Sequence, residues 1–227
     1  DSALPAPGDR EVVGTSLADR ILAWDPATGR LRAEAGLSVR TIREALLPRG
    51  WFIPVTPGTQ YVTLGGMVAA DVHGKNHHVA GCIGRHVRGL RMRTADGALV
   101  DCSRAEGEHP ELFQATVGGM GLTGHILEVE VDLASVPTSW VLQESERIPH
   151  IDAFLRGLKE AAADWPFTVG WIDCLAKGAG LGRGILMRGR WAEPSEAPEV
   201  APSPKRRLGV PFVAPGWLLG PWSVRAF

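Results

Sequence analysis

The stretch His-Gly-Lys-Asn-His-His, which begins at His73, places three histidines and a lysine in six positions. Three readings are open for it. His73, His77 and His78 are imidazoles of the kind that bind zinc. In a loop that faces a bound ligand, Lys75 would instead offer charge to an anion, and His73 would orient the reacting group. The third reading is an exposed polar loop. Gly74 argues against a metal, because it breaks the helix that would align His73 with His77, and we predict no metal site.

A glycine-rich stretch just before this loop is a candidate phosphate site. Glycine lets the backbone approach a pyrophosphate closely. A helix that starts at Leu64 would also point free N–H groups and its positive dipole end at the anion. A tight strand-to-helix turn explains the same glycines equally well, so both readings stay open. The residues concerned are Gly58, Thr59, Thr63, Leu64, Gly65 and Gly66.

Two further features are ambiguous when taken alone. Four glycines, at Gly118, Gly119, Gly121 and Gly124, precede an alternating strand, which indicates backbone packed close to a ligand or to another loop. Trp171 lies on a predicted strand, where a tryptophan is more often a core residue than the wall of a substrate site.

The elements that must position these residues follow from hydrophobic periodicity and turn chemistry. The pattern predicts hairpins at 21–36 and 87–103, and strands at 51–55, 125–133, 139–147, 167–173 and 184–191. It predicts helices at 38–47, 64–72, 108–114 and 150–163, with Ser38 and Thr63 as N-caps. Hairpins and short helices without regular βαβ units indicate an α+β fold. A doubly wound nucleotide fold is disfavoured, because no Gly-x-Gly-x-x-Gly follows a first strand. A shift in composition divides the chain into 1–134 and 135–227.

Composition narrows the class of partner. The 227 residues are 44% hydrophobic and carry a net charge of −1, which argues against broad capture of nucleic acid. Three widely spaced cysteines without a Cys-x-x-Cys favour reduced thiols. A peripheral membrane contact stays open, through the apolar stretch at 210–219 and the basic run at 205–207. The chain begins without methionine or a signal pattern and ends without a polar tail, so we expect a fragment; localisation, cytoplasmic or cell-envelope, stays undecided.

The order of these pieces resembles the flavin-binding oxidoreductases of the vanillyl-alcohol oxidase superfamily and, within it, the decaprenylphosphoryl-β-D-ribose 2-oxidase family. The likeness rests on the run from Pro57 to His78, on the glycines at 81–84 and 118–124, and on the turn at 94–97. It extends more weakly to 171–173 and 181–183. The resemblance implies a PCMH-type FAD-binding domain of two α+β subdomains at 1–134, lacking its N-terminal part. Part of an antiparallel-sheet substrate domain follows at 135–227.

The resemblance also implies the site. FAD is implied as a non-covalent cofactor, with His73 beside the flavin ring, and His73 and Lys75 as the catalytic residues. Lys75 and Trp171 are implied to border the substrate. The implied cofactor-binding residues are Gly58, Thr59, Thr63, Leu64, Gly65, Gly66, Ala70, Asp71, Val72, His73 and His125.

The implied reaction oxidises the C2 hydroxyl of a polyprenylphosphoryl ribose, a lipid-linked sugar, in the synthesis of a cell-envelope arabinan precursor. A partner reductase would complete the epimerisation. Two alternatives stay open: a sugar-lactone or alditol oxidase of the same superfamily, and a non-catalytic module that has lost its flavin. Three departures matter. The family's first phosphate loop would precede Asp1, the rest of its substrate domain would follow Phe227, and His125 stands where an aliphatic residue is usual. We therefore expect this piece alone to be catalytically incomplete.

Overall fold

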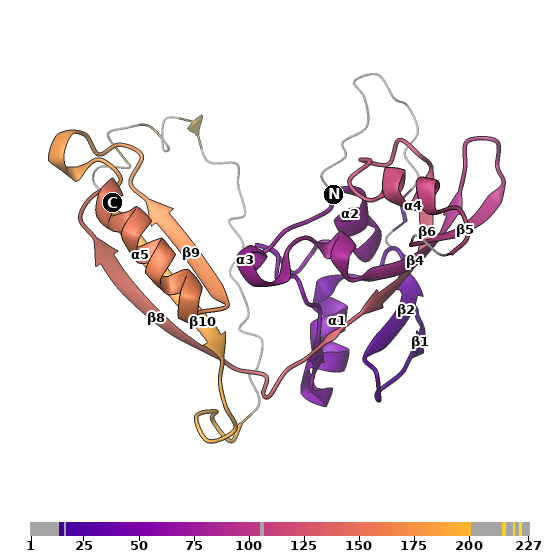
Figure 1. Ribbon diagram of the computed structural model, residues 1–227, viewed down its shortest axis with the longest axis horizontal. Coiled ribbons are helices and arrows are strands. Elements are labelled where there is room, and N and C mark those ends of the chain that lie inside the picture. The colour runs from indigo at the N-terminus through magenta and orange to yellow at the C-terminus, as the bar shows by residue number, and fades with distance from the viewer. Residues whose placement is uncertain are drawn as a thin grey trace.

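The computed structural model describes residues 14–15, 17–104 and 107–200, together with 215, 216, 220 and 223. Its elements form two bodies joined by an extended connection (Figure 1). Every strand pair within the described residues is antiparallel, and short helices are interleaved with the hairpins. The prediction of an α+β fold is confirmed. None of the helices described here is long and apolar enough to cross a membrane.

The first body is built on a five-stranded sheet in the order β1-β2-β6-β4-β5. Its strands are β1 (Ile21–Trp24), β2 (Arg30–Glu34), β4 (Val87–Arg93), β5 (Leu99–Ser103) and β6 (His125–Asp132). Its helices are α1 (Val39–Leu46), α2 (Leu64–Ala69), α3 (His77–Ala80) and α4 (Pro110–Thr116). Short 3-10 helices lie at η1 (Leu47–Arg49) and η2 (Ile83–Arg85). One core joins the sheet to the helices, with Leu31, Ile42, Met67 and Val129 fully buried.

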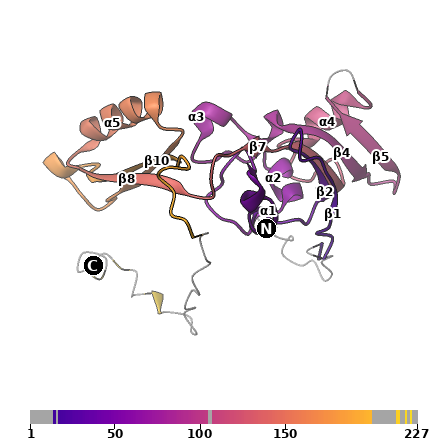
Figure 2. The same ribbon diagram turned by 90° about the horizontal axis from the view of Figure 1, so that it is seen from below.

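The second body is a three-stranded sheet with one helix on one of its faces. The sheet has the order β8-β10-β9, with β8 (Val141–Ile148), β9 (Phe167–Ile172) and β10 (Gly184–Trp191). Helix α5 (Ile151–Asp164) covers one face, as the view from below shows (Figure 2). Ile148, Phe154 and Leu186 form the small core between them. The turn η3 (Gly178–Gly180) lies between β9 and β10.

A two-stranded sheet lies where the chain leaves the first body. Strand β3 (Trp51–Phe52) pairs with β7 (Ala134–Ser135), and Val136 still belongs to the first core. The predicted boundary at residue 134 therefore falls inside a paired strand. The division of the chain at that residue stays a prediction.

Local chemistry predicted most element starts. Ser38 and Thr63 cap α1 and α2 as expected: the Ser38 side chain accepts from Thr41 N, and that of Thr63 from Gly66 N. The strand expected at 51–55 is only β3, because Asn76 takes the backbone hydrogen bonds of the residues that follow it.

The helix expected to run to residue 72 ends at Ala69. The Val68 carbonyl accepts from Gly118 N at 3.0 Å, and the Ala69 carbonyl from Met120 N at 2.7 Å. Asp71 then takes a left-handed φ of 40°. A distant loop, not a local stop signal, ends this helix.

Candidate active site

The loop that begins at His73 is fastened to the segment after β3. Lys75 N donates to the Thr56 carbonyl at 3.0 Å. The Asn76 side chain donates to the Pro54 carbonyl at 2.7 Å and accepts from Thr56 N at 3.1 Å. A Cβ on Gly74 would lie 2.4 Å from the Thr56 carbonyl oxygen, so only glycine lets the two backbone segments pack this closely. The sequence reasoning missed Asn76; its one signal is an amide inside a run of histidines and a lysine.

The same loop contacts the second body. Thr168 N, at the start of β9, donates to the Lys75 carbonyl at 3.0 Å. His78 Nε2 hydrogen-bonds to the Trp165 carbonyl at 2.9 Å. In Figure 1, α3 accordingly lies between the two bodies. The loop is thus one of the contacts through which the first body meets the three-stranded sheet.

A cavity of about 670 Å³ lies at this contact. Thr56, Gly58 and Lys75 line it from the first body. Its opposite wall is mostly apolar and comes from the three-stranded sheet: Val141, Gln143, Phe167, Val169, Gly170, Trp171, Met187, Arg188, Gly189 and Trp191. Three residues predicted for the site, Gly58, Lys75 and Trp171, therefore line one cavity. Its volume is in the range of small-molecule sites.

The apolar wall follows from strand alternation. Side chains at successive strand positions point to opposite faces, so Val169 and Trp171 share one face of β9. On the other face, Phe154 of α5 packs so tightly on Gly170 that an added Cβ would lie 2.7 Å from its ring. Trp171 is 67% exposed and is therefore no core residue. The usual expectation for a tryptophan on a strand does not hold here.

The glycine-rich turn does not hold an anion in the expected way. Leu64 N donates to the Leu37 carbonyl at 2.9 Å and Gly65 N to the Ala35 carbonyl at 2.8 Å. Gly66 N donates to the Thr63 side chain at 3.3 Å. The prediction of free N–H groups at the start of α2 was wrong, because two of them bond to carbonyls of the segment before α1 and the third bonds to the capping side chain of Thr63. Leu64, Gly65 and Gly66 stay cofactor-binding predictions without those donors.

The turn before α2 is more open. The backbone N–H groups of Gly58 and Thr59 have no acceptor among the described residues. A Cβ on Gly58 would find nothing within 4 Å. The anion-binding potential of this stretch therefore lies at residues 58–59, beside the cavity.

The residues from Ala70 to His73 form a turn in which Asp71 has a positive φ, and the glycine run at 81–84 is hydrogen-bonded to this turn. Asp71 Oδ1 accepts from Gly84 N at 2.9 Å, and a Cβ on Gly84 would lie 2.5 Å from Val117. The run that starts at Gly118 packs on the end of α2. This contact explains a close approach of the backbone at Gly118, and proximity of the run to a ligand stays a prediction.

The three imidazoles of the loop do not converge. The His73 and His77 rings meet edge to face with centroids 5.5 Å apart, whereas His78 turns to Trp165. No group of three or more metal-binding side chains is found within the described ranges. His77 Nδ1 lies 3.8 Å from Cys82 Sγ. Burial, and after it the negative charge of Asp71, raises the pKa of the Cys82 thiol, so a neutral thiol stands beside this imidazole.

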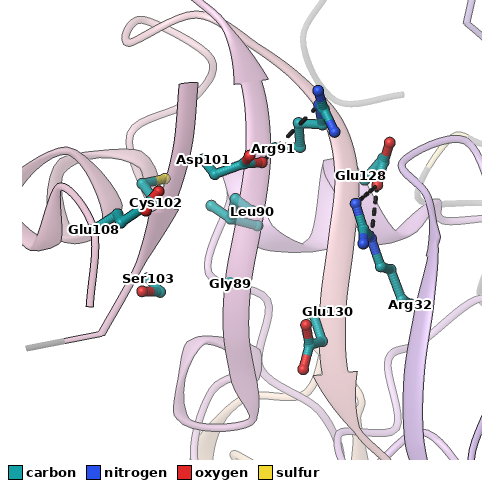
Figure 3. A pocket seen from close by; sticks show the side chains of 10 residues that line it. All are labelled: Arg32, Gly89, Leu90, Arg91, Asp101, Cys102, Ser103, Glu108, Glu128 and Glu130. Carbon is teal, nitrogen blue, oxygen red and sulfur yellow. Dashed lines mark hydrogen bonds and ion pairs between the residues drawn. The ribbon is translucent and has the colours of Figure 1, made fainter. Parts of the chain in front are cut away.

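Two features lie apart from this cavity. His125 is exposed at the start of β6, opposite Arg93, and does not line it. A smaller cavity of about 250 Å³ lies on the five-stranded sheet (Figure 3). Its charges are largely paired, with Arg32 2.6 Å from Glu128 and Arg91 4.0 Å from Asp101. It contains none of the predicted site residues, and we assign it no function.

Comparison with known proteins decides the family. Residues 4–103 match the family described as an FAD binding domain. Decaprenylphosphoryl-beta-D-ribose oxidase of Mycolicibacterium smegmatis is 35% identical over 188 residues, which are 82% of this chain and 41% of that protein. This chain carries a PCMH-type FAD-binding domain. A Streptomyces coelicolor protein from the mprA 5′ region is 39% identical over 162 residues, 71% of this FAD-binding chain and 43% of its own length. L-gulonolactone oxidase of Scyliorhinus torazame is 27% identical over 158 residues, 69% of the chain and 32% of that protein.

The FAD-binding chain thus spans less than half of the length of these relatives. FAD is its cofactor, as the resemblance implied. The residues present at the cavity fit that group. The backbone N–H groups of Gly58, which lines the cavity, and of Thr59, the next residue in the chain, are donors available to the pyrophosphate of FAD.

Proposed function

We propose that the protein is an FAD-dependent oxidoreductase that oxidises a sugar hydroxyl, namely C2 of a polyprenylphosphoryl ribose. One observation carries the proposal. A lysine, held by its backbone to both bodies, faces an apolar wall across one cavity. A cation opposite an apolar surface suits a substrate whose phosphate joins a sugar to a hydrocarbon chain. The likeness to the oxidase of Mycolicibacterium smegmatis supports the same choice.

Three side chains have different proposed roles in the reaction. Lys75 makes a charge-assisted contact with the substrate phosphate, and Trp171 offers its exposed face to the apolar part. His73 is exposed but does not line the cavity, so its proposed role in orienting the sugar hydroxyl rests on the resemblance and on its place two residues before Lys75. When bound, FAD would supply the acceptor for the hydride of the sugar carbon. The hydroxyl proton is released as the C–O bond becomes a carbonyl, so the product is a ketone.

The ketone product and the lipid-linked substrate imply two partners for the proposed reaction, a second enzyme and a membrane. A ketone at C2 must be reduced by a second enzyme before the sugar becomes an arabinose unit, so a partner reductase belongs to the proposal. A lipid-linked substrate brings the protein to a membrane surface. The basic run at 205–207 and all of the apolar stretch at 210–219 except residues 215 and 216, for which that contact was left open, lie outside the described residues.

The proposal is tested by Lys75→Ala in the full-length gene product loaded with FAD. The contact that is lost is a hydrogen bond to a charged group, of about 1.5–3 kcal/mol, so KM for polyprenylphosphoryl ribose should rise at least ten-fold, with kcat much less affected. Lys159→Ala is the matched control, because Lys159 is an exposed lysine on α5, across the sheet from the cavity. Equal kinetics for Lys75→Ala and the wild type would refute the role of Lys75. Oxidation of L-gulonolactone but not of the phosphorylated sugar would move the function to the lactone oxidases, to which the chain is also similar.

A further inference from the structure

Asn76 differs from its neighbours in burial. It is 7% exposed, whereas His73, Lys75, His77 and His78 are all exposed. A buried amide costs stability unless its polar atoms are paired. Both ends of this amide are paired with backbone: the nitrogen donates to the Pro54 carbonyl, and the oxygen accepts from Thr56 N.

These bonds fix more than one residue. The Asn76 backbone carbonyl also accepts from Val79 N at 3.0 Å and from Ala80 N at 2.8 Å, so the same residue starts α3. Lys75 N bonds to the Thr56 carbonyl. Thr56 and Lys75 both line the cavity, whereas Asn76 does not. The buried amide therefore fixes the backbone segments of two cavity-lining residues relative to each other, although Asn76 does not line the cavity itself.

We propose that Asn76 is a positioning residue for Lys75. A lysine side chain is long and flexible, so its use as a phosphate contact depends on a backbone that is already in place. The Asn76 amide supplies that fixed backbone and touches no substrate itself. This inference rests on the proposed function, in which Lys75 meets the substrate phosphate.

A double-mutant cycle on the full-length, FAD-loaded protein separates positioning from simple stability. Asn76→Ala and Asn76→Asp are each made with Lys75 present and with Lys75→Ala. Asp keeps an acceptor for Thr56 N but puts an oxygen against the Pro54 carbonyl. The Kd for polyprenylphosphoryl ribose is obtained without oxygen, from the dependence of the rate of flavin bleaching on the substrate concentration. We expect each Asn76 variant to weaken binding about ten-fold with Lys75 present and less than about two-fold without it, because coupled residues are not additive.

Thr116→Val is the matched control. Thr116 is also buried, at 1% exposed, and donates to the Leu112 carbonyl at 2.7 Å, but it does not line the cavity. It should lower Tm and leave the Kd unchanged. A second readout needs no flavin. In the FAD-free protein, the Thr168 amide, which bonds to the Lys75 carbonyl, should exchange its hydrogen faster in Asn76→Ala, while amides of β4 and β6 keep their wild-type rates.

The outcomes are distinct. Equal loss of affinity from Asn76→Ala in both Lys75 backgrounds, or a similar loss from Thr116→Val, overturns the positioning role while the proposed function stands. Faster exchange throughout the first body in Asn76→Ala also overturns it. A wild-type protein whose flavin spectrum does not respond to the lipid-linked sugar overturns the substrate assignment, and this inference with it.

Discussion

Gly58 offers the sharpest test of where the cofactor and substrate bind. Gly58 and Lys75 both line the cavity. A Cβ added to Gly58 would meet no atom within 4 Å, and the backbone of Gly58 does not have a positive φ. Gly58→Ala should therefore leave the fold intact. It should raise the free energy of unfolding by about 1 kcal/mol at most. The new methyl group would project into open space at the cavity.

The expected effect on binding is much larger. An extra methyl group forced into a well-packed contact costs about 1–3 kcal/mol, so Gly58→Ala should weaken FAD or substrate binding about ten-fold. The assay pairs a thermal melt with titration of the FAD-free full-length protein by FAD, followed by titration of the loaded protein with substrate.

Substitutions at two further glycines serve as controls for Gly58→Ala. Gly14 is exposed, also has nothing within 4 Å and also lacks a positive φ, so Gly14→Ala should change neither Tm nor affinity. Gly74→Ala should lower Tm, because its Cβ would lie 2.4 Å from the Thr56 carbonyl oxygen. Wild-type affinity of Gly58→Ala for both FAD and substrate would refute the assignment of this cavity.

Trp171 is 67% exposed, so Trp171→Ala should raise KM several-fold with little change in Tm. Trp191→Ala should lower Tm, because its ring packs edge to face on Phe52 and Phe167, at 5.9 and 5.7 Å; a lower Tm for Trp171→Ala would contradict the first expectation. Burial, and after it Asp101, raises the pKa of the Cys102 thiol from 9.0 to about 11, so the folded state holds this proton more tightly than the unfolded chain. The stability that Cys102 contributes is thus present below pH 9.0 and lost as pH rises through about 11. Iodoacetamide at pH 9.0 should modify exposed Cys174 and spare Cys102 until denaturant is added; equal rates at the two thiols would contradict the burial of Cys102.

The sequence predicted what short-range chemistry decides. Ser38 and Thr63 cap helices because each hydroxyl lies three residues before the N–H that it accepts from. The sequence pattern along β6, β9 and β10 predicted the bounds of those strands within one residue. Such features need no knowledge of distant segments.

Long-range contacts explain what the sequence did not predict. The end of α2 depends on Gly118 and Met120, some fifty residues later in the chain. The role of Asn76 depends on Pro54, 22 residues earlier. The free N–H groups expected at Leu64 and Gly65 were lost to carbonyls of the segment before α1, which no pattern around those glycines indicates.

The central claim is that this FAD-binding chain is part of an enzyme that oxidises a lipid-linked sugar. The most direct measurement is the visible spectrum of the full-length, FAD-loaded protein, without oxygen, before and after addition of polyprenylphosphoryl ribose. Bleaching of the oxidised-flavin bands, with one ketone formed per flavin, is the predicted result. Flavin bands that stay unchanged with this substrate, in a protein that holds FAD, would contradict the claim.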